Sequence, residues 1–329
     1  MPKITDDMIH PELQKKARSL RRGSQQFSLR KTKLMKVMCK MLHGRHSKKM
    51  KYKQEYLILP DGSKLRICVY TPLERKGNVP GILWIHGGGY AIGAPEQDDT
   101  DILRFVSASG CIVVSPDYTL SLDKSYPATL NDCYLALLWL HDNGPNYGMR
   151  PDQIFVGGTS AGGGLAAAIS LLARDKGEVN IAFQMPIYPM LDDRTTESST
   201  DNDAPVWNSS KNVASWKLYL GDLYGSAEIP YYAVPARAED YSGLPPACIY
   251  VGSIEPFFDE AVTYAKNLEK CGIPVFFRAF DGCFHALDRM CPDTDITKEA
   301  VSFLMDSFNY AVNNYFAPQN PAAASTGGA

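Results

Sequence analysis

The sequence lacks several patterns that mark common classes of protein. No apolar run is long enough to span a membrane, so we expect no stable membrane insertion. The eight cysteines form no C-x-x-C pair, which argues against a zinc site, and we expect neither a metal nor a cofactor. The formal net charge is only −2 over 329 residues, so the composition gives no reason to expect binding to nucleic acid.

The cysteines and the first residues favour a cytoplasmic protein. Cys68, Cys111 and Cys248 fall within apolar segments, which is typical of reduced thiols in a protein core rather than of disulfides. The residues from Met1 to Asp7 lack the pattern of a signal peptide. The sequence leaves open whether the protein is a monomer or a homodimer.

Positive charge is concentrated near the N-terminus. Residues 1–51 contain fifteen Lys and Arg residues but only three acidic ones. This segment contains an apolar stripe at helical spacing among several lysines, formed by Leu34, Val37, Met38, Met41 and Leu42. We expect a helix whose apolar face packs on its own protein, in preference to a helix that lies on a membrane surface.

From about residue 81 onward, strand-like and helix-like segments alternate. The strand-like segments are almost entirely apolar, which predicts a parallel sheet covered by helices on both faces. We expect strands at 82–85, 111–115, 154–156, 181–187, 248–251 and 275–280, and helices at 98–109, 129–143, 165–172, 258–271 and 297–316. A Pro-Asp-Gly turn at 60–62 predicts a β-hairpin upstream of them.

The interval 192–230 interrupts this alternation. It begins with many Asp, Ser and Thr residues and continues with Trp207, Trp216, Tyr219 and Tyr224 in a helix-like stretch. A loop of this length inside a compact domain usually has a function or a structure of its own. We therefore divide the chain into an N-terminal helical segment (1–50), a core in two parts (51–191 and 231–317), an insertion (192–230) and a low-complexity, disordered tail (318–329).

The most informative stretch contains Ser160 between two glycines, Gly158 and Gly162. An apolar strand precedes it and an alanine-rich helix follows it. A strand that turns directly into a helix leaves little room for side chains and holds the serine in a strained conformation with its hydroxyl exposed. No lysine follows the glycines, so a phosphate-binding loop is not indicated. The context is that of a nucleophile elbow.

A second motif, His86-Gly87-Gly88-Gly89, ends an apolar strand upstream. Glycines are needed where backbone N–H groups must approach a substrate oxygen closely. With these two motifs in this order, the chain resembles the hormone-sensitive-lipase-like carboxylesterases of the α/β-hydrolase fold, in the branch with Gly-Thr-Ser-Ala-Gly at the elbow. The resemblance covers roughly residues 56–315, and its other segments are Asp117-Tyr118-Thr119-Leu120, Tyr126-Pro127-Ala128 and Phe284-His285.

The resemblance implies a mostly parallel central sheet with helices on both faces and a helical cap, and we expect the N-terminal segment (1–50) and the insertion (192–230) to form the two parts of this cap. It implies a serine esterase that acts on a small-molecule ester with a short-to-medium acyl chain, through an acyl-enzyme intermediate. It places the oxyanion hole at the backbone N–H groups of Gly88, Gly89 and Ala161. We expect aromatic residues to line the substrate pocket, although each of them could equally well pack the cap on the core: Tyr90, Trp207, Trp216 and Phe257.

The base that activates the serine comes late in the chain in this fold. His285 fits, because it follows the expected strand 275–280 on a loop that contains a glycine, whereas the other histidines lie in the N-terminal segment, in the glycine motif or at the end of a helix. Cys283 lies beside it, and we interpret this cysteine as a packing residue. We expect His86 and Asp117 to support the site without reacting.

The carboxylate that orients the histidine departs from the family pattern. Glu255 stands where the family has an aspartate, and we expect it to do the same work. Asp259 is the alternative, but it lies in or near the next helix, where it could bond loop backbone instead.

The sequence leaves three other functions open. An amidase or a lipase could use the same groups, and a homologue on this fold could bind a small molecule without catalysis. The basic N-terminal segment also suggests that lysines at the entrance attract anionic esters.

Overall fold

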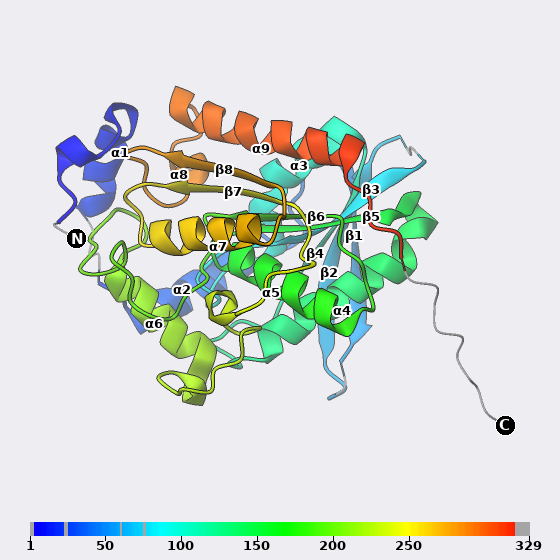
Figure 1. Cartoon of the computed structure of the whole chain (residues 1–329), viewed down its shortest axis with the longest axis horizontal. Coiled ribbons are helices and arrows are strands. Elements are labelled where there is room, and N and C mark those ends of the chain that lie inside the picture. Colours follow the sequence, from blue (N-terminus) through cyan, green and yellow to red (C-terminus); the bar gives the residue numbers. More distant parts are fainter. Residues whose placement is uncertain (1–2, 23–25, 60, 75–76, 320–329) are drawn as a thin grey trace.

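A twisted sheet runs through the middle of the molecule and separates two layers of helices (Figure 1). The computed structural model describes residues 3–22, 26–59, 61–74 and 77–319. These residues form an eight-stranded sheet in the order β1-β2-β4-β3-β5-β6-β7-β8. Its strands are β1 Met50–Ile58, β2 Lys64–Pro72, β3 Val79–Ile85, β4 Ile112–Pro116, β5 Met149–Thr159, β6 Phe183–Ile187, β7 Ala247–Gly252 and β8 Val275–Phe280.

The pairing of the strands confirms the predicted mostly parallel sheet. Strands β3 to β8 are all parallel to one another, and only β2 is antiparallel to both of its neighbours. The hairpin predicted around residues 60–62 is the β1–β2 pair, with Ile58 opposite Lys64, although Pro60 lies outside the described residues.

The helices follow the predicted positions closely. They are α1 Pro11–Arg21, α2 Leu29–Lys40, α3 Asp99–Ser109, α4 Ala128–Asn143, α5 Ala161–Lys176, α6 Ser209–Leu220, α7 Phe258–Lys270, α8 Leu287–Met290 and α9 Asp295–Asn314. In Figure 1, α3 and α9 lie above the sheet, and α4 and α5 lie below it. No helix in the described ranges has the length and apolar content needed to cross a bilayer.

Strand β3 shows why the sheet can be covered on both faces. Every residue of this strand is buried. Trp84 packs against Phe105 of α3 at a ring distance of 4.9 Å, whereas Leu83 belongs to the core on the side of α4 and α5. Each such side chain contributes roughly 1.5–3 kcal/mol on burial. The parallel strands are therefore fixed from both sides, and the loops at their carboxyl ends are held in place.

The N-terminal segment contains two helices with different environments. Leu13 and Ala17 of α1 are buried, and the nearby His10 N–H donates to the Gly282 carbonyl at 2.9 Å. Helix α2 has no buried residue. The expectation that its apolar stripe packs on the protein is wrong, because the opposite face of α2, with Thr32 and Met35, is the one turned inward.

The insertion and the tail differ from the core in regularity. The insertion contains α6, and its Ser210 hydroxyl accepts a hydrogen bond from the Phe27 N–H at 3.2 Å, which joins it to the segment before α2. At the start of the tail, Gln319 accepts from the Asn180 N–H at 2.9 Å. The rest of the predicted disordered tail, 320–329, lies outside the described residues.

Candidate active site

Ser160 lies at the sharp turn between β5 and α5. Its backbone has φ 59° and ψ −120°, a region that residues with a side chain rarely adopt. The turn is fixed because the Ser160 N–H donates to the Ile187 carbonyl at 2.9 Å. A Cβ atom at position 162 would lie 2.0 Å from the Ile85 carbonyl oxygen, so only glycine fits there. The close packing of α5 against the end of β3 therefore holds the Ser160 backbone in its strained conformation.

A continuous chain of polar contacts runs from Ser160 through His285 to Glu255. The Ser160 Oγ lies 2.8 Å from His285 Nε2, and His285 Nδ1 forms a short hydrogen bond with the Glu255 carboxylate. The other carboxylate oxygen accepts from the Gly252 N–H at 2.7 Å. Because Nδ1 faces a carboxylate, it carries the proton, and Nε2 is left to accept from the serine.

These three side chains are buried although they come from distant parts of the sequence. Ser160, His285 and Glu255 are 6%, 3% and 0% exposed. They stand on the loops that follow β5, β8 and β7, which end at the same edge of the sheet. Parallel strands bring such loops together, and this is why residues 125 positions apart can meet.

The two alternatives considered for this chain of contacts lie elsewhere. The Asp259 carboxylate accepts from the Ser198 N–H at 2.6 Å and so supports a loop of the insertion. The Cys283 side chain is buried, and burial raises the pKa of its thiol to about 12. A thiol with that pKa stays protonated at neutral pH, which suits a packing residue and not a nucleophile.

The glycine motif is held by side chains on both sides. The Gly87 carbonyl lies 2.9 Å from His86 Nδ1 and accepts from Gln97 Nε2 at 3.1 Å. Burial lowers the pKa of His86 to about 4, so its ring is neutral, and it stacks on Tyr118 at 4.1 Å. Gln97 was not predicted from the sequence; nothing in its local pattern distinguishes it from other polar residues.

The backbone N–H groups of Gly88, Gly89 and Ala161 lie near Ser160. None of these N–H groups donates to an acceptor among the residues that the structure describes. Gly88 has φ +128°, and a Cβ atom there would lie 2.0 Å from the Ile92 carbonyl oxygen. Because the Gly87 carbonyl points toward His86 and Gln97, the trans peptide turns the Gly88 N–H to the opposite side.

A cavity of about 450 Å³ opens in front of the serine. Ser160 and His285 form its floor with the glycine motif, and its walls come from both parts of the expected cap, including Phe27, Met35 and Trp207. The cap segments also contribute polar side chains to the cavity, among them Lys31 and Lys211.

Only one of the four aromatic residues expected in the pocket lines this cavity. That residue is Trp207, and the predicted roles of Tyr90, Trp216 and Phe257 need correction. Tyr90 stacks on Tyr219 at 3.9 Å and is tilted against Trp216, while Phe257 lies edge-on to the His285 ring at 5.0 Å. All three are fully buried behind the cavity wall, where they pack the insertion on the core.

Comparisons with known proteins agree with this geometry. Residues 82–289 match a family described as alpha/beta hydrolase fold. The solved structure of a bacterial heroin esterase superposes with a TM-score of 0.85 and 32% identity, over 94% of this chain and 99% of that one. The chain belongs to the hormone-sensitive-lipase-like carboxylesterases of the α/β-hydrolase fold.

Two relatives of this esterase family are similar in sequence as well. Carboxylesterase NlhH of Mycobacterium tuberculosis is 35% identical over 213 residues, which cover 64% of this chain and 66% of NlhH, just under two thirds of its length. An arylesterase of Saccharolobus solfataricus is 33% identical over 230 residues, 68% of this chain and 72% of that one.

A half-buried arginine lines the cavity of this α/β-hydrolase. Arg289 lines the cavity and binds Asp98 at 2.9 Å, Asp101 at 3.3 Å and the Gln97 carbonyl at 3.1 Å. Burial raises the pKa of Asp98 to about 6 even though the arginine opposes this shift. The carboxylates of Asp98 and Asp101 thus compensate the positive charge of the half-buried arginine. Arg289 was not predicted, because its partners are almost 190 positions away.

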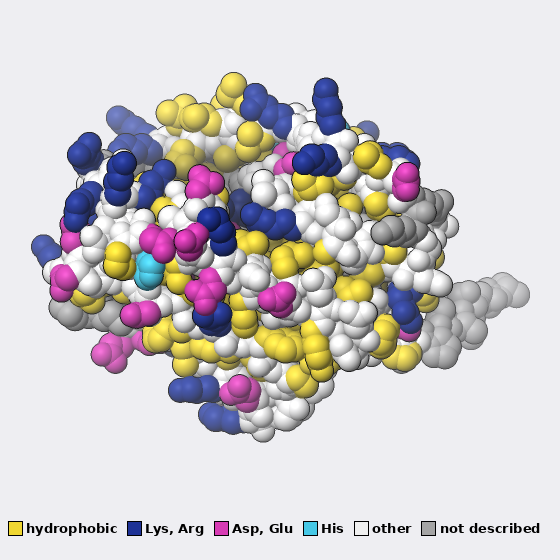
Figure 2. Space-filling model, turned by 90° about the horizontal axis from the view of Figure 1, so that it is seen from above, with side chains coloured by type: hydrophobic (Ala, Val, Ile, Leu, Met, Phe, Trp, Pro, Cys, Tyr) yellow, Lys and Arg dark blue, Asp and Glu magenta, His cyan; other side chains and the backbone are white. Residues whose placement is uncertain are grey.

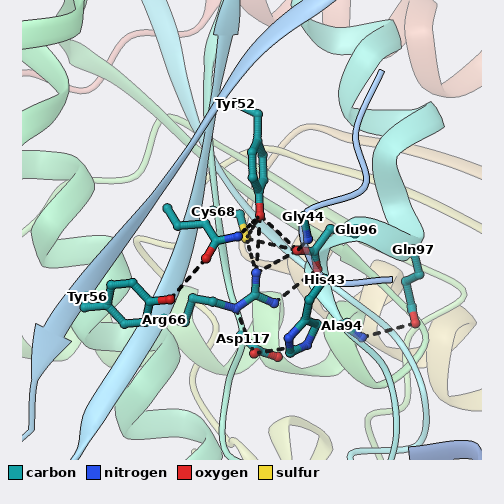
Figure 3. Close-up of polar contacts among 11 residues, drawn as sticks. His43, Gly44, Tyr52, Tyr56, Arg66, Cys68, Ala94, Glu96, Gln97 and Asp117 are labelled. Atoms are coloured by element: carbon teal, nitrogen blue, oxygen red, sulfur yellow. Dashed lines mark hydrogen bonds and ion pairs between the residues drawn. The ribbon is translucent and has the colours of Figure 1, made fainter. Parts of the chain in front are cut away.

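A second polar cluster, shown in Figure 3, joins the N-terminal segment to the glycine motif. Arg66 binds Glu96 through two hydrogen bonds of 2.6 and 3.1 Å and Asp117 through one of 3.1 Å. The Glu96 carboxylate also accepts from the Gly44 N–H at 2.8 Å. Although burial opposes it, the hydrogen bonds from Arg66 lower the pKa of Glu96 to about 2. Asp117 therefore lies in a supporting cluster, next to the segment that contains Gln97.

Residues that could hold a metal are not grouped at this site. In the ranges that the structure describes, no three His, Cys, Asp or Glu side chains come together in a way that could bind a metal ion.

Proposed function

We propose that the protein is a serine carboxylesterase that hydrolyses small esters with short-to-medium acyl chains. The observation that carries the proposal is the unbroken series of contacts Ser160–His285–Glu255 beside three N–H groups that lack an acceptor in the described chain. Nucleophile, base, orienting carboxylate and anion-binding donors are the parts that acyl transfer requires.

The reaction would begin when the Ser160 Oγ attacks the ester carbonyl carbon and its proton passes to His285 Nε2. The negative charge that develops on the carbonyl oxygen would be stabilised by the N–H groups of Gly88, Gly89 and Ala161. Glu255 would stabilise the imidazolium that forms, because its carboxylate already contacts Nδ1.

The acyl-enzyme would form when the bond between the carbonyl carbon and the alcohol oxygen breaks. His285 gives its proton to the departing alcohol, and a water molecule then attacks the Ser160 ester with His285 again acting as base. The acid leaves, the proton returns to Ser160, and the enzyme is regenerated.

The cavity supports a small substrate. Its volume of about 450 Å³ is near the lower end of ligand pockets, and Trp207, Phe27 and Met35 offer it apolar surface. The names of the similar proteins, a carboxylesterase, an arylesterase and a heroin esterase, also favour ester substrates.

Ser160→Ala tests the proposal most directly. We expect it to abolish the hydrolysis of 4-nitrophenyl butyrate, since no other nucleophile contacts His285 Nε2 in the described residues. Ser170→Ala, a serine of the same helix that bonds the Ala166 carbonyl, is the matched control and should keep its activity. Retained activity in Ser160→Ala would discard the mechanism, and matched ester and anilide substrates would show whether amides are also cleaved.

A further inference from the structure

Exposed apolar side chains are distributed very unevenly over the molecule. Of the twelve large hydrophobic residues that are exposed in the described chain, six lie within residues 29–41. The most exposed of these are Leu34, Val37, Met38 and Met41, at 62%, 61%, 56% and 68%. We call these four residues the outer face of α2; Met41 directly follows the helix. A protein seldom leaves such a stripe in water without a use for it.

The geometry of α2 explains why this stripe points outward. The four residues are spaced i, i+3, i+4 and i+7, which places them on one side of the helix. Thr32 and Met35 line the cavity from the other side, and Lys36 forms an ion pair with Asp123 of the core. The helix is therefore attached by its inner side, and its outer face stays largely exposed.

Positive charge surrounds the outer face. The sequence has no Asp or Glu between Glu12 and Glu55. Lys33 and Lys40 are exposed on α2, and neither forms an ion pair with a carboxylate among the described residues. Figure 2 shows Lys and Arg side chains gathered at the left of the molecule, the end where Figure 1 places α1 and α2, with hydrophobic side chains near them.

From these observations we infer that the outer face of α2 binds an anionic lipid surface, with the helix lying flat on it. An apolar stripe flanked by lysines is the arrangement that places hydrocarbon at the level of the lipid headgroups while the ammonium groups contact lipid phosphates. The inference does not depend on the proposed catalysis, because it concerns only surface side chains outside the cavity.

Other occupants fit the same face less well. A second copy of the chain would bring two strongly positive segments together, since fifteen of the 34 Lys and Arg residues lie in residues 1–51. A nucleic acid would leave the apolar stripe unused. A folded acidic protein would need a groove shaped for a convex helix, whereas lipid adapts to it.

The charge distribution would also orient the protein. Only three of the 36 acidic residues lie within residues 1–51, so the remainder of the chain is net negative and an anionic surface would repel it. Because Thr32 and Met35 of the same helix line the cavity, the docked protein would hold its cavity close to the lipid surface.

Vesicle flotation with the full chain tests this inference. The protein should float with phosphatidylcholine vesicles that contain phosphatidylglycerol and should not float with pure phosphatidylcholine vesicles. Its binding to the anionic vesicles should weaken as the salt concentration is raised. Lys33→Gln and Lys40→Gln should each weaken binding by roughly fivefold at low salt. The triple variant Leu34→Gln/Val37→Gln/Met38→Gln should lose binding by more than about tenfold.

The double variant Tyr56→Gln/Ile58→Gln is the matched control. These residues of β1 are 54% and 66% exposed, and their replacement should leave vesicle binding unchanged. All variants should keep the circular dichroism spectrum and the thermal unfolding midpoint of the wild type, which shows that they fold.

Several outcomes would overturn the inference. Equal binding to vesicles without phosphatidylglycerol, or an equal loss in the control, would mean unspecific adsorption. If no vesicle is bound and the triple variant instead dissociates a dimer in sedimentation, the face is an interface between copies. Poly-glutamate serves as a model of an acidic protein partner. If the chain binds poly-glutamate and no vesicle, the partner is an acidic protein and the inference fails. Vesicle binding without any ester hydrolysis would leave this inference intact and overturn the proposed function alone.

Discussion

The loops at the carboxyl edge of the sheet and helix α2, which covers them, contribute to the same cavity in opposite ways. Glu255 on a loop is fully buried, and both of its carboxylate oxygens are bonded. Helix α2 buries no residue and is attached to the core by few polar contacts. The loops therefore fix the positions of reacting atoms, whereas α2 provides a surface that can be changed with little effect on those positions.

Replacing the buried Glu255 carboxylate tests the fixed positions of the loop residues and should have the largest effect. We expect Glu255→Gln to lower kcat by about 10⁴-fold, because an amide cannot stabilise the imidazolium and favours the wrong tautomer. Steady-state kinetics with 4-nitrophenyl butyrate measure this loss. Asp259→Asn is the control and should stay near the wild-type rate, since Asp259 supports a loop of the insertion. If Asp259→Asn has the large effect, the roles of the two acids are reversed.

Breaking the Arg66–Glu96 pair should reduce stability rather than chemistry. Glu96→Gln removes the charged group that binds the buried Arg66 guanidinium through two hydrogen bonds and leaves Asp117 as its remaining carboxylate. It should cost about 3 kcal/mol of unfolding free energy at pH 7, measured by urea titration. The pKa of Glu96 is about 2 in the folded protein against an ordinary value of 4.5, so its contribution is complete above pH 4.5 and is lost as the pH falls toward 2. The variant should lack this pH dependence.

The nearby Asp98 should change the stability of the protein with pH in the opposite direction to Glu96, because its pKa is raised and not lowered. Burial raises its pKa to about 6, so the folded state holds this proton more tightly than the unfolded state between pH 4 and 6. The contribution of Asp98 to stability should therefore decrease as the pH rises through that window. An Asp98→Asn variant in which the pH dependence of stability is unchanged would contradict this assignment.

Gln97 should influence the rate through the glycine motif. Gln97→Leu removes the donor to the Gly87 carbonyl and should lower kcat roughly tenfold with little change in KM, because the Gly88 N–H loses its fixed direction. Gln97→Glu keeps the length of the side chain but also lacks the donor, so it should behave in the same way. A wild-type kcat in Gln97→Glu would show that the donor is not needed.

The smallest effect is expected at α2. Lys31 is exposed and lines the cavity, so Lys31→Gln should lower the preference for an anionic 4-nitrophenyl hemisuccinate over the neutral butyrate by about threefold at low salt. Lys33→Gln makes the same charge change on the same helix outside the cavity. The idea of attracted anionic esters fails if both variants give the same ratio or if the ratio does not depend on salt.

The parts of the fold that could be predicted from the sequence are those where the backbone geometry or the burial of a strand permits only a few residue types. The elbow was predicted because only glycine fits at position 162, beside the Ile85 carbonyl. The strands were predicted because a sheet covered on both faces requires continuous apolar runs, as in β3. His285 was found because it alone follows a late strand on a loop.

The rest depends on contacts that no local pattern records. The stripe in α2 predicts a helix, but periodicity does not say which side meets the protein, and here the side with Thr32 and Met35 does. Tyr90 and Trp216 are aromatic residues near the site, yet only packing decides that they lie behind its wall. Gln97 and Arg289 bind groups from other elements, and a single sequence gives no sign of such pairs.

The contact between His10 and the Gly282 carbonyl has a consequence for the order in which the protein is made. Translation makes residue 10 well before the loop that carries His285. The histidine loop therefore gains this support only when the two segments meet in the folding chain. A substitution near residue 10 that prevents the contact would act on the histidine loop from a distant part of the sequence.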